Sequence, residues 1–181
     1  MKLKKLSTPT SPISIKDAKN FFRIIGDEHN ADIQRAIDAS VERAEQITNL
    51  QLAKVTYEGY LDSFQRTIKL PKPPFISLSG FEYINADGER VVFEDYYIDD
   101  IAIPSVIYCK TIPSDVSDDK NSVIITFETG YEVLPKAIES WILINALTMF
   151  ENRENAVIGT IVDTKFKTYH DHLLDSFRIR P

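Results

Sequence analysis

The chain has 181 residues, a formal net charge of −6 and a sequence pI near 5.1. This acidity argues against a protein that grips nucleic acid through the phosphates, because such binding requires clustered Lys and Arg side chains. The length fits one domain, or one domain with an insertion, and is sufficient to bury a hydrophobic core. Cys109 is the only cysteine, which excludes a disulfide within the chain. No stretch is long and apolar enough to span a bilayer, so no membrane partner is expected.

The first third of the chain predicts a flexible arm followed by two helices. Residues 1–11 are polar and rich in Ser, Thr and Pro, which is typical of a loose terminal segment. Ser14 can cap a short amphipathic helix, and Gly26 is placed to end it. Apolar residues then recur at spacings of three and four over residues 31–52, which predicts a longer helix with a charged outer face.

The middle of the chain, residues 54–130, predicts an antiparallel β unit inserted between helices. Apolar and polar residues alternate there in several short runs, as they do in half-buried strands. Asn85–Ala86–Asp87–Gly88 separates two such runs and is a strong hairpin signal. The same stretch holds 7 basic and 13 acidic residues, so the negative charge of the chain is concentrated in it.

A hydrophobic helix is predicted over residues 134–152, and the rest of the chain is expected to be organised around it. Pro135 suits the first helical turn, where a missing N–H costs nothing. One apolar face, which includes Trp141, should pack in the chain's own core. A second apolar face, which includes Leu143 and Leu147, should meet something else, for example another copy of the chain.

The C-terminal segment, residues 156–181, predicts an extended arm followed by a helix with an apolar stripe. Two interpretations of this stripe remain open: it docks on another protein as an exposed apolar patch, or it folds back onto its own domain. Together with the preceding helix it supplies the candidate interface residues, which are Trp141, Leu143, Leu147, Phe166, Tyr169, Leu173, Leu174 and Phe177.

These patterns together predict an α+β fold with a mainly α-helical body and an inserted antiparallel β unit. One domain is expected over residues 1–181. Its segments are 1–11 (flexible arm), 12–53 (helical), 54–130 (β insertion), 131–155 (core helix) and 156–181 (C-terminal arm and helix).

No group of residues predicts catalysis, a cofactor or a metal site. His170 and His172 are two positions apart, so on a helix they point to different faces and cannot easily share one ion. No His lies at a spacing from Cys109 that would suggest a catalytic or metal site, so Cys109 is expected to be a small buried apolar residue. An acidic loop lacks the Gly and the terminal Glu of an EF-hand calcium site; its carboxylates are Asp115, Asp118 and Asp119.

Four groups of segments resemble, in their order along the chain, the head–tail connector proteins of tailed phages, also called adaptor or head-completion proteins. They are Pro12 to Lys19 with Phe22–Arg23–Ile24; Leu70–Pro71–Lys72–Pro73–Pro74 with Tyr83 and Asp87–Gly88; Ile125 to Tyr131 with Leu134–Pro135 and Phe150 to Glu154; and Ile158–Gly159–Thr160 with Leu173–Leu174 and Arg178. No single group is specific, but the four in this order are. The resemblance covers residues 12–178.

The resemblance implies a structural virion protein of a tailed phage or prophage, without catalytic activity. It implies a ring of about a dozen copies that docks below the portal protein, extends the DNA channel and meets the next connector or tail component. Such a protein is assembled in the host cytoplasm and resides at the head–tail interface of the virion. The acidity of the chain agrees with a conduit for double-stranded DNA, because a channel in which DNA slides should not bind phosphates tightly.

An alternative hypothesis is a small-molecule or glycan-binding module that uses the aromatic residues of the β unit. Aromatic side chains in strands can form a binding platform, although they are more often core or edge residues. The tyrosines concerned are Tyr57, Tyr60, Tyr83, Tyr96, Tyr97 and Tyr108.

Overall fold

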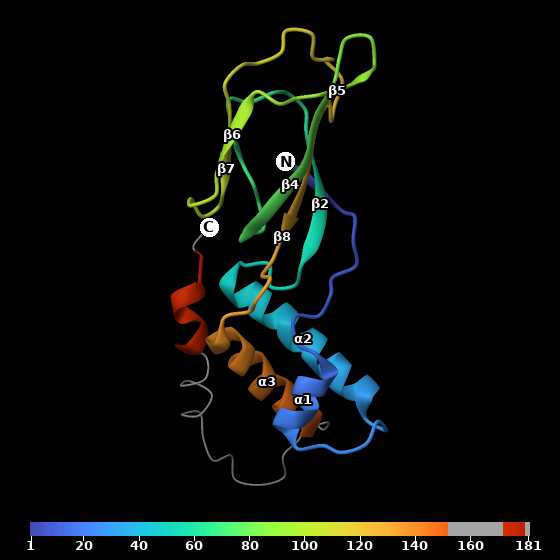
Figure 1. Cartoon of the computed structure of the whole chain (residues 1–181), viewed down its shortest axis with the longest axis vertical. Coiled ribbons are helices and arrows are strands. Elements are labelled where there is room, and N and C mark those ends of the chain that lie inside the picture. Colours follow the sequence, from blue (N-terminus) through green and yellow to red (C-terminus); the bar gives the residue numbers. More distant parts are fainter. Residues whose placement is uncertain (152–171, 180–181) are drawn as a thin grey trace. The chain divides into compact units, whose positions relative to one another are not determined.

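A computed structural model of the chain describes residues 1–151 and 172–179, which form two compact units (Figure 1). The first, here called the β unit, consists of Met1–Thr10 and Ala53–Tyr131. The second, here called the helical unit, consists of Ser11–Leu52 and the chain from Glu132 onward.

The expectation of a mainly α-helical body is wrong. Helices make up 31% of the structure and strands 29%, and the eight strands form two antiparallel sheets, so the fold is a sheet-rich α+β fold. Two differences explain why the structure has more strand and less helix than predicted. Residues 2–5 form a strand in place of a flexible arm, and the described part of the expected C-terminal helix is a six-residue 3-10 helix.

The β unit contains a five-stranded and a three-stranded sheet, both antiparallel. The larger sheet has the order β1 (Lys2–Lys5), β2 (Val55–Leu61), β8 (Val123–Thr129), β4 (Phe75–Ile84), β5 (Arg90–Val92). The smaller has the order β3 (Thr67–Lys69), β7 (Val106–Cys109), β6 (Tyr96–Asp99). The strands expected between residues 54 and 130 are therefore present.

One hydrophobic core joins the two sheets of the β unit. Alternate residues of β2 are buried, as a strand with one covered face requires. Phe81 of β4 and Phe127 of β8 share a cluster with Ile107 of β7, so both sheets contribute to the same core. Phe64 closes it by stacking on Phe81, with the ring centroids 5.5 Å apart.

The predicted hairpin at residues 85–88 is confirmed and connects β4 to β5. Asn85 Oδ1 accepts the backbone N–H groups of Asp87 at 3.1 Å and Glu89 at 2.8 Å, which stabilises the turn. Gly88 has φ +82°, a left-handed conformation that glycine adopts without steric cost.

The N-terminal residues form the edge strand β1 and pair with β2. The Leu6 N–H continues this pairing by donating to the Thr56 carbonyl oxygen at 2.9 Å. Gly59 of β2 leaves room for the side chain of Met1, since a Cβ at position 59 would lie 2.6 Å from the Met1 sulfur. The flexible arm predicted over residues 1–11 is therefore wrong for residues 2–5. The residues rich in Ser, Thr and Pro, on which that prediction depended, follow β1.

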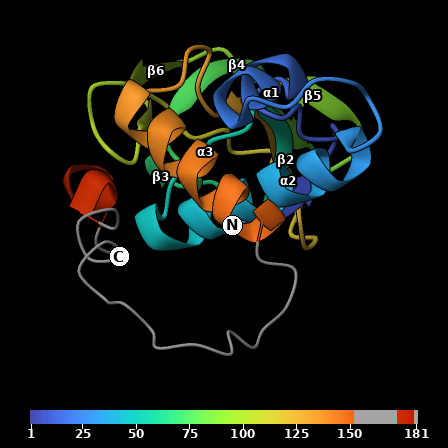
Figure 2. The same cartoon turned by 90° about the horizontal axis from the view of Figure 1, so that it is seen from below.

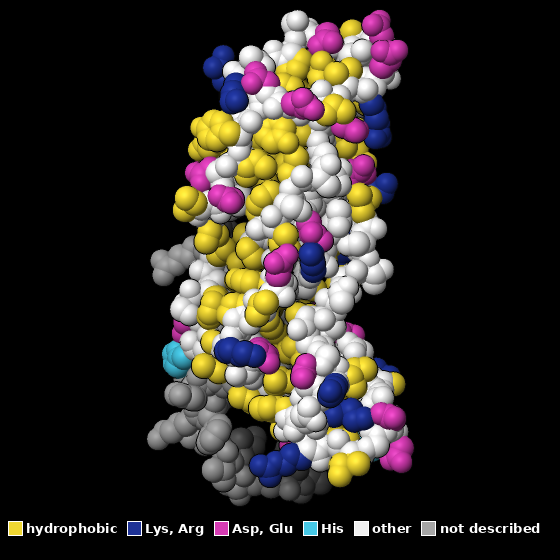
Figure 3. Space-filling model, in the orientation of Figure 1, with side chains coloured by type: hydrophobic (Ala, Val, Ile, Leu, Met, Phe, Trp, Pro, Cys, Tyr) yellow, Lys and Arg dark blue, Asp and Glu magenta, His cyan; other side chains and the backbone are white. Residues whose placement is uncertain are grey.

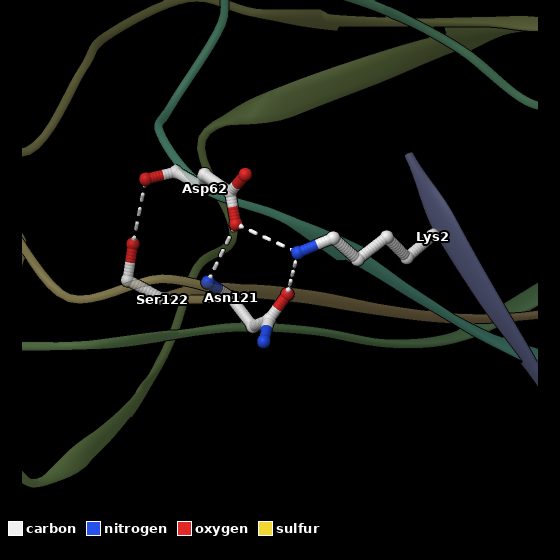
Figure 4. Close-up of polar contacts among 4 residues, drawn as sticks. All are labelled: Lys2, Asp62, Asn121 and Ser122. Carbon is white, nitrogen blue, oxygen red and sulfur yellow. Dashed lines mark hydrogen bonds and ion pairs between the residues drawn. The ribbon is translucent and has the colours of Figure 1, made fainter.

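A polar network fixes the start of β1 to the ends of β2 and β8 (Figure 4). Lys2 Nζ lies 3.4 Å from Asp62 Oδ1 and 3.0 Å from Asn121 Oδ1. The same Asp62 oxygen accepts the Asn121 N–H at 3.0 Å, while the Ser122 hydroxyl donates to the Asp62 carbonyl oxygen at 3.4 Å. The Asn121 N–H, with the Lys2 ammonium, holds the pKa of the Asp62 carboxyl below its usual range.

The helical unit contains α1 (Ile15–Phe22), α2 (Asn30–Thr48), α3 (Lys136–Glu151) and the 3-10 helix η1 (His172–Phe177). Ser14 caps α1 as predicted, since its Oγ accepts the Asp17 N–H at 3.1 Å. Gly26, however, does not end this helix. The helix stops at Phe22, and Arg23 takes the left-handed conformation with φ 59°.

The long helices α2 and α3 lie side by side (Figure 2). Ile33 and Ile37 of α2 and Ile138 and Ile142 of α3 are fully buried apolar residues of this unit. Polar contacts also join the two helices: Asn145 Nδ2 donates to the Ser40 hydroxyl at 3.0 Å, and that hydroxyl donates to the Met149 sulfur at 3.6 Å.

The short helix η1 folds back onto the helical unit. Leu174 is fully buried, and the Ile179 N–H donates to the Thr48 carbonyl oxygen at 2.9 Å. Asn49, which ends α2, adds a second link by donating its side-chain N–H to the Ile179 carbonyl oxygen at 2.9 Å. Leu174 therefore packs onto the chain's own core, while the two interpretations of the whole stripe stay predictions.

Trp141→Ala should lower the free energy of unfolding of the helical unit by about 3–5 kcal/mol, because it truncates a buried aromatic side chain. The Trp141 side chain is only 2% exposed. Trp141 is also the only tryptophan, so the variant has no tryptophan fluorescence that could report its unfolding. Denaturation of the variant is therefore followed by far-ultraviolet circular dichroism.

Ile144→Ala is the matched control, since Ile144 lies on the same helix and is 39% exposed. It should cost less than about 1 kcal/mol. A Trp141→Ala chain that unfolds together with the parent chain would show that the indole is not part of the core.

Asp62→Ala should release β1 at neutral pH, and the parent chain should release it in acid. A carboxyl whose pKa is lowered on folding stabilises the fold above its unfolded pKa, and this contribution is lost as the pH falls through the folded pKa. Amide hydrogen exchange of residues 2–5, corrected for the intrinsic rate, should therefore accelerate in the parent as the pH is lowered through the acid range, below the usual pKa of an aspartate carboxyl. The Asp62→Ala chain should exchange fast throughout this range. Asp87→Ala, in the exposed hairpin, should leave the exchange of β1 unchanged.

Candidate interaction surfaces

Cys109 has the properties of a core residue and not those of a nucleophile. It is buried in the shared core of the β unit. Burial, with a smaller contribution from the negative charge of Asp95, raises the pKa of its thiol to about 11. The thiol is therefore protonated at neutral pH.

The acidic and histidine residues considered in the sequence form local contacts. Asp115 accepts the Tyr83 hydroxyl at 3.1 Å, and Asp119 accepts the Ser117 hydroxyl at 3.0 Å. His172 Nδ1 lies 2.7 Å from Asp175 Oδ2. His170 lies outside the described residues. Within residues 1–151 and 172–179, no three His, Cys, Asp or Glu side chains are grouped to hold a metal ion.

The tyrosines of the β unit do not form an aromatic platform. Tyr57 and Tyr83 are buried in the core. Of the six tyrosines considered, only Tyr97 is exposed. It stacks on its cross-strand neighbour Tyr108, with the ring centroids 4.9 Å apart. This pair is a cross-strand contact of an edge strand, so the structure gives the glycan-binding alternative no specific support.

The residues predicted as an interface are distributed between the core and the surface of the helical unit. Trp141, Leu143 and Leu174 are buried, so they have little surface left for a partner. The half-buried members are Leu147, Leu173 and Phe177. Phe166 and Tyr169 lie outside the described residues.

An open groove of about 760 Å³ runs between α2, α3 and the segment after η1. Its floor includes Trp141, and its rim carries Glu42, Arg43 and Arg178. Among the described residues predicted as an interface, only Trp141 lines this groove, and it is 2% exposed. The charges of the groove have both signs, so they select no particular partner.

The free edge of β1 is the first surface that the sequence did not indicate. No strand among the described residues pairs with this edge. Leu3 and Lys5 oppose the buried residues Gly59 and Tyr57, so they lie on the core side of the sheet. Lys2 and Lys4 lie on the other side, where Lys4 is 3.8 Å from Glu58. The edge thus combines exposed apolar and basic side chains on an open strand backbone.

The loop after β6 is the second such surface. Asp99 Oδ1 accepts the backbone N–H groups of Ile101 and Ala102, both at 3.2 Å, which holds the loop in a turn. The Ser105 hydroxyl then donates to the Ala102 carbonyl oxygen at 3.3 Å. Ile101 and Ile103 are exposed at this turn. Figure 3 shows hydrophobic side chains beside acidic ones where β6 ends, at the left edge of the β unit.

A signal for this loop was present in the sequence, which reads Asp99–Asp100–Ile101–Ala102–Ile103–Pro104. The apolar residues between the aspartates and the proline do not follow the spacing of a strand or a helix. The pattern therefore does not assign them to the buried face of either element. The edge of β1 had no comparable signal, because pairing with β2 depends on residues more than fifty positions away.

None of the helices within the described residues is long and apolar enough to cross a membrane.

The chain is similar to solved structures of other proteins, although no known sequence family matches it. No protein-family model and no curated protein sequence matches the chain. Solved structures of gene transfer agent particles do match over 100% of this chain and 97% of theirs, at 16% identity. They are the neck of an empty particle with C6 symmetry (TM-score 0.78), the virion of a native particle (0.77) and the neck of a native particle with C12 symmetry (0.69).

At this identity the likeness establishes the fold. Because it spans both chains almost completely, it includes the sheets and the helices together. The chain therefore has the fold of a chain found in the neck of a gene transfer agent particle.

Proposed function

We propose that this chain is a structural protein of the neck of a tailed phage or phage-like particle. The observation that carries the proposal is the fold, which matches a chain of a particle neck over 100% of this chain at a TM-score of 0.78. The resemblance of its sequence segments to head–tail connectors points independently to the same part of a virion. The proposal includes no catalytic activity.

The proposed assembly is a ring of about a dozen copies. The structures with the same fold were solved with C6 and C12 symmetry, which are ring symmetries. In this proposal both units act together as one connector domain. The ring docks below the portal protein, extends the DNA channel, and presents its other end to the next connector or tail component. Assembly takes place in the host cytoplasm, and the genome that encodes the chain is that of a phage or a prophage.

The charge of the chain suits a conduit. At −6 per copy, a ring repels the phosphates of double-stranded DNA on average, so DNA can pass without being held. Local basic groups, such as those of β1, are partly offset by neighbouring acidic side chains.

The proposal predicts that particles made without this chain lack a joined neck, with heads and tails separate. The chain should also be found at the head–tail junction, because a structural neck protein remains in the particle. A small epitope inserted at Asp87, at the tip of the exposed hairpin, gives a label for electron microscopy of intact particles. A symmetric average of the junction should show a closed ring.

Two results would contradict this proposal. One is particles that join heads to tails normally without the chain. The other is a label found on the capsid shell or the tail tip. An epitope placed at the same position in a chain carrying Trp141→Ala is the control for loss of folding, since that chain should not enter particles.

The chain should not bind double-stranded DNA tightly. In about 150 mM salt, no complex with a duplex should form below about 100 µM protein, because non-specific affinity comes from clustered basic groups. Electrophoretic mobility and fluorescence anisotropy measure this. A complex in the micromolar range that weakens steeply with salt would contradict the conduit proposal.

A further inference from the structure

We propose that the loop after β6 of one copy packs on the free β1 edge of the neighbouring copy. This contact rests on the proposed ring and names the surfaces that join its subunits. Both surfaces belong to the β unit of each copy.

The loop is built to present apolar side chains to a partner. Ile101 is 90% exposed and Ile103 is 68% exposed, although backbone hydrogen bonds to Asp99 hold the turn between them. An ordered turn loses little conformational entropy on binding, so the burial of two isoleucines is not offset by ordering of the loop. Asp99 and the exposed Asp100 give the base of the loop a negative charge.

The β1 edge has the complementary chemistry. Leu3 is 36% exposed and Leu6 is 49% exposed, so apolar surface remains uncovered at the outer edge of the sheet. Lys5 shares the core side of the sheet with Leu3, while Lys2 and Lys4 lie on the other side and remain mostly exposed in spite of their ion pairs within the sheet. Apolar side chains can meet apolar side chains here while lysines meet aspartates.

The lysines also determine which partner the edge accepts. Lysine on an edge strand normally prevents pairing with other strands, because a second basic or neutral strand would bury or crowd the charge. An acidic loop removes this obstacle. A second copy of the same chain supplies such a loop in every subunit, so no other partner is required.

The positions of the two surfaces make the contact head-to-tail. β1 is an edge of the five-stranded sheet, and β6 is an edge of the three-stranded sheet. One copy therefore offers its loop to one neighbour and its β1 edge to the other, which is the heterologous contact that generates rings.

The test uses two full-length variants. Ile101→Asp disables the loop, and Leu3→Asp disables the edge. Both substitutions are at exposed positions, and circular dichroism with thermal melting checks that each chain folds. Sedimentation velocity over a range of concentrations should show that the parent chain assembles. Each variant alone should be monomeric at concentrations where the parent chain assembles, because its dissociation constant is raised by about tenfold or more.

Mixing the two variants gives the decisive result. The Ile101→Asp chain keeps an intact edge and the Leu3→Asp chain keeps an intact loop, so an equimolar mixture should form one-to-one dimers that cannot grow. Ile25→Asp is the matched control, since Ile25 is 96% exposed but lies in the helical unit. It should assemble like the parent chain.

A charge exchange gives a second test that does not depend on Leu3. Asp100→Lys and Lys5→Asp should each weaken assembly, and the chain carrying both should recover, because opposite charges again face each other at every contact. Assembly of the parent chain should also weaken as salt is raised.

The outcomes separate this contact from the proposed function. Variants that assemble like the parent chain, or a mixture that stays monomeric, would overturn the contact and leave the ring in place. A loss of assembly with Ile25→Asp alone would place the contact on the helical unit. A parent chain that remains monomeric at all concentrations would overturn the contact and also count against the ring.

Discussion

The pairing of β2 with β8 is the constraint on which the rest of the β unit depends. The register places Val55 opposite Thr129, so the inserted segment begins and ends at the same place in the sheet. Gly130 follows with φ +117°, and a Cβ there would lie 2.5 Å from the Ala53 carbonyl oxygen. Only glycine allows the two passing backbones to approach so closely. A long β unit can therefore interrupt a helical sequence between α2 and α3 without separating the residues on either side of it.

The same pairing determines which strands are central and which are edges. β2, β8 and β4 have neighbours on both sides, and their alternate residues fill the core with Phe81 and Phe127. β1 and β6 are left at the edges of their sheets. Central strands are fixed by burial, whereas edge strands keep free backbone groups and exposed side chains. The surfaces proposed to join copies of the chain are thus a consequence of how the core is built.

The differences between expectation and structure follow from the range of the interactions involved. The hairpin at residues 85–88 and the Ser14 cap depend on residues a few positions apart, and both were predicted correctly. α1 ends at Phe22 and not near Gly26 as predicted. The interactions that end it are also local, but an arginine in the left-handed conformation, here Arg23, has no strong sequence signal. β1 was predicted as an arm because its partner, β2, is remote in sequence. The estimate of a mainly helical body failed for this reason and because the C-terminal stripe yields only the short helix η1 among the described residues.

The sequence alone determined the alternation of strands over residues 54–130, the helical periodicity on either side, and the acidic composition. These properties depend on side-chain type and local spacing, which can be read from a single chain. The tertiary structure decided that Leu143 and Leu174 are buried, and that Ile101, Ile103 and Leu3 remain exposed. The reason is physical: the hydrophobic effect is non-directional, so side-chain type does not determine which apolar surface a residue meets, and only the folded chain fixes which of these side chains its own core can cover.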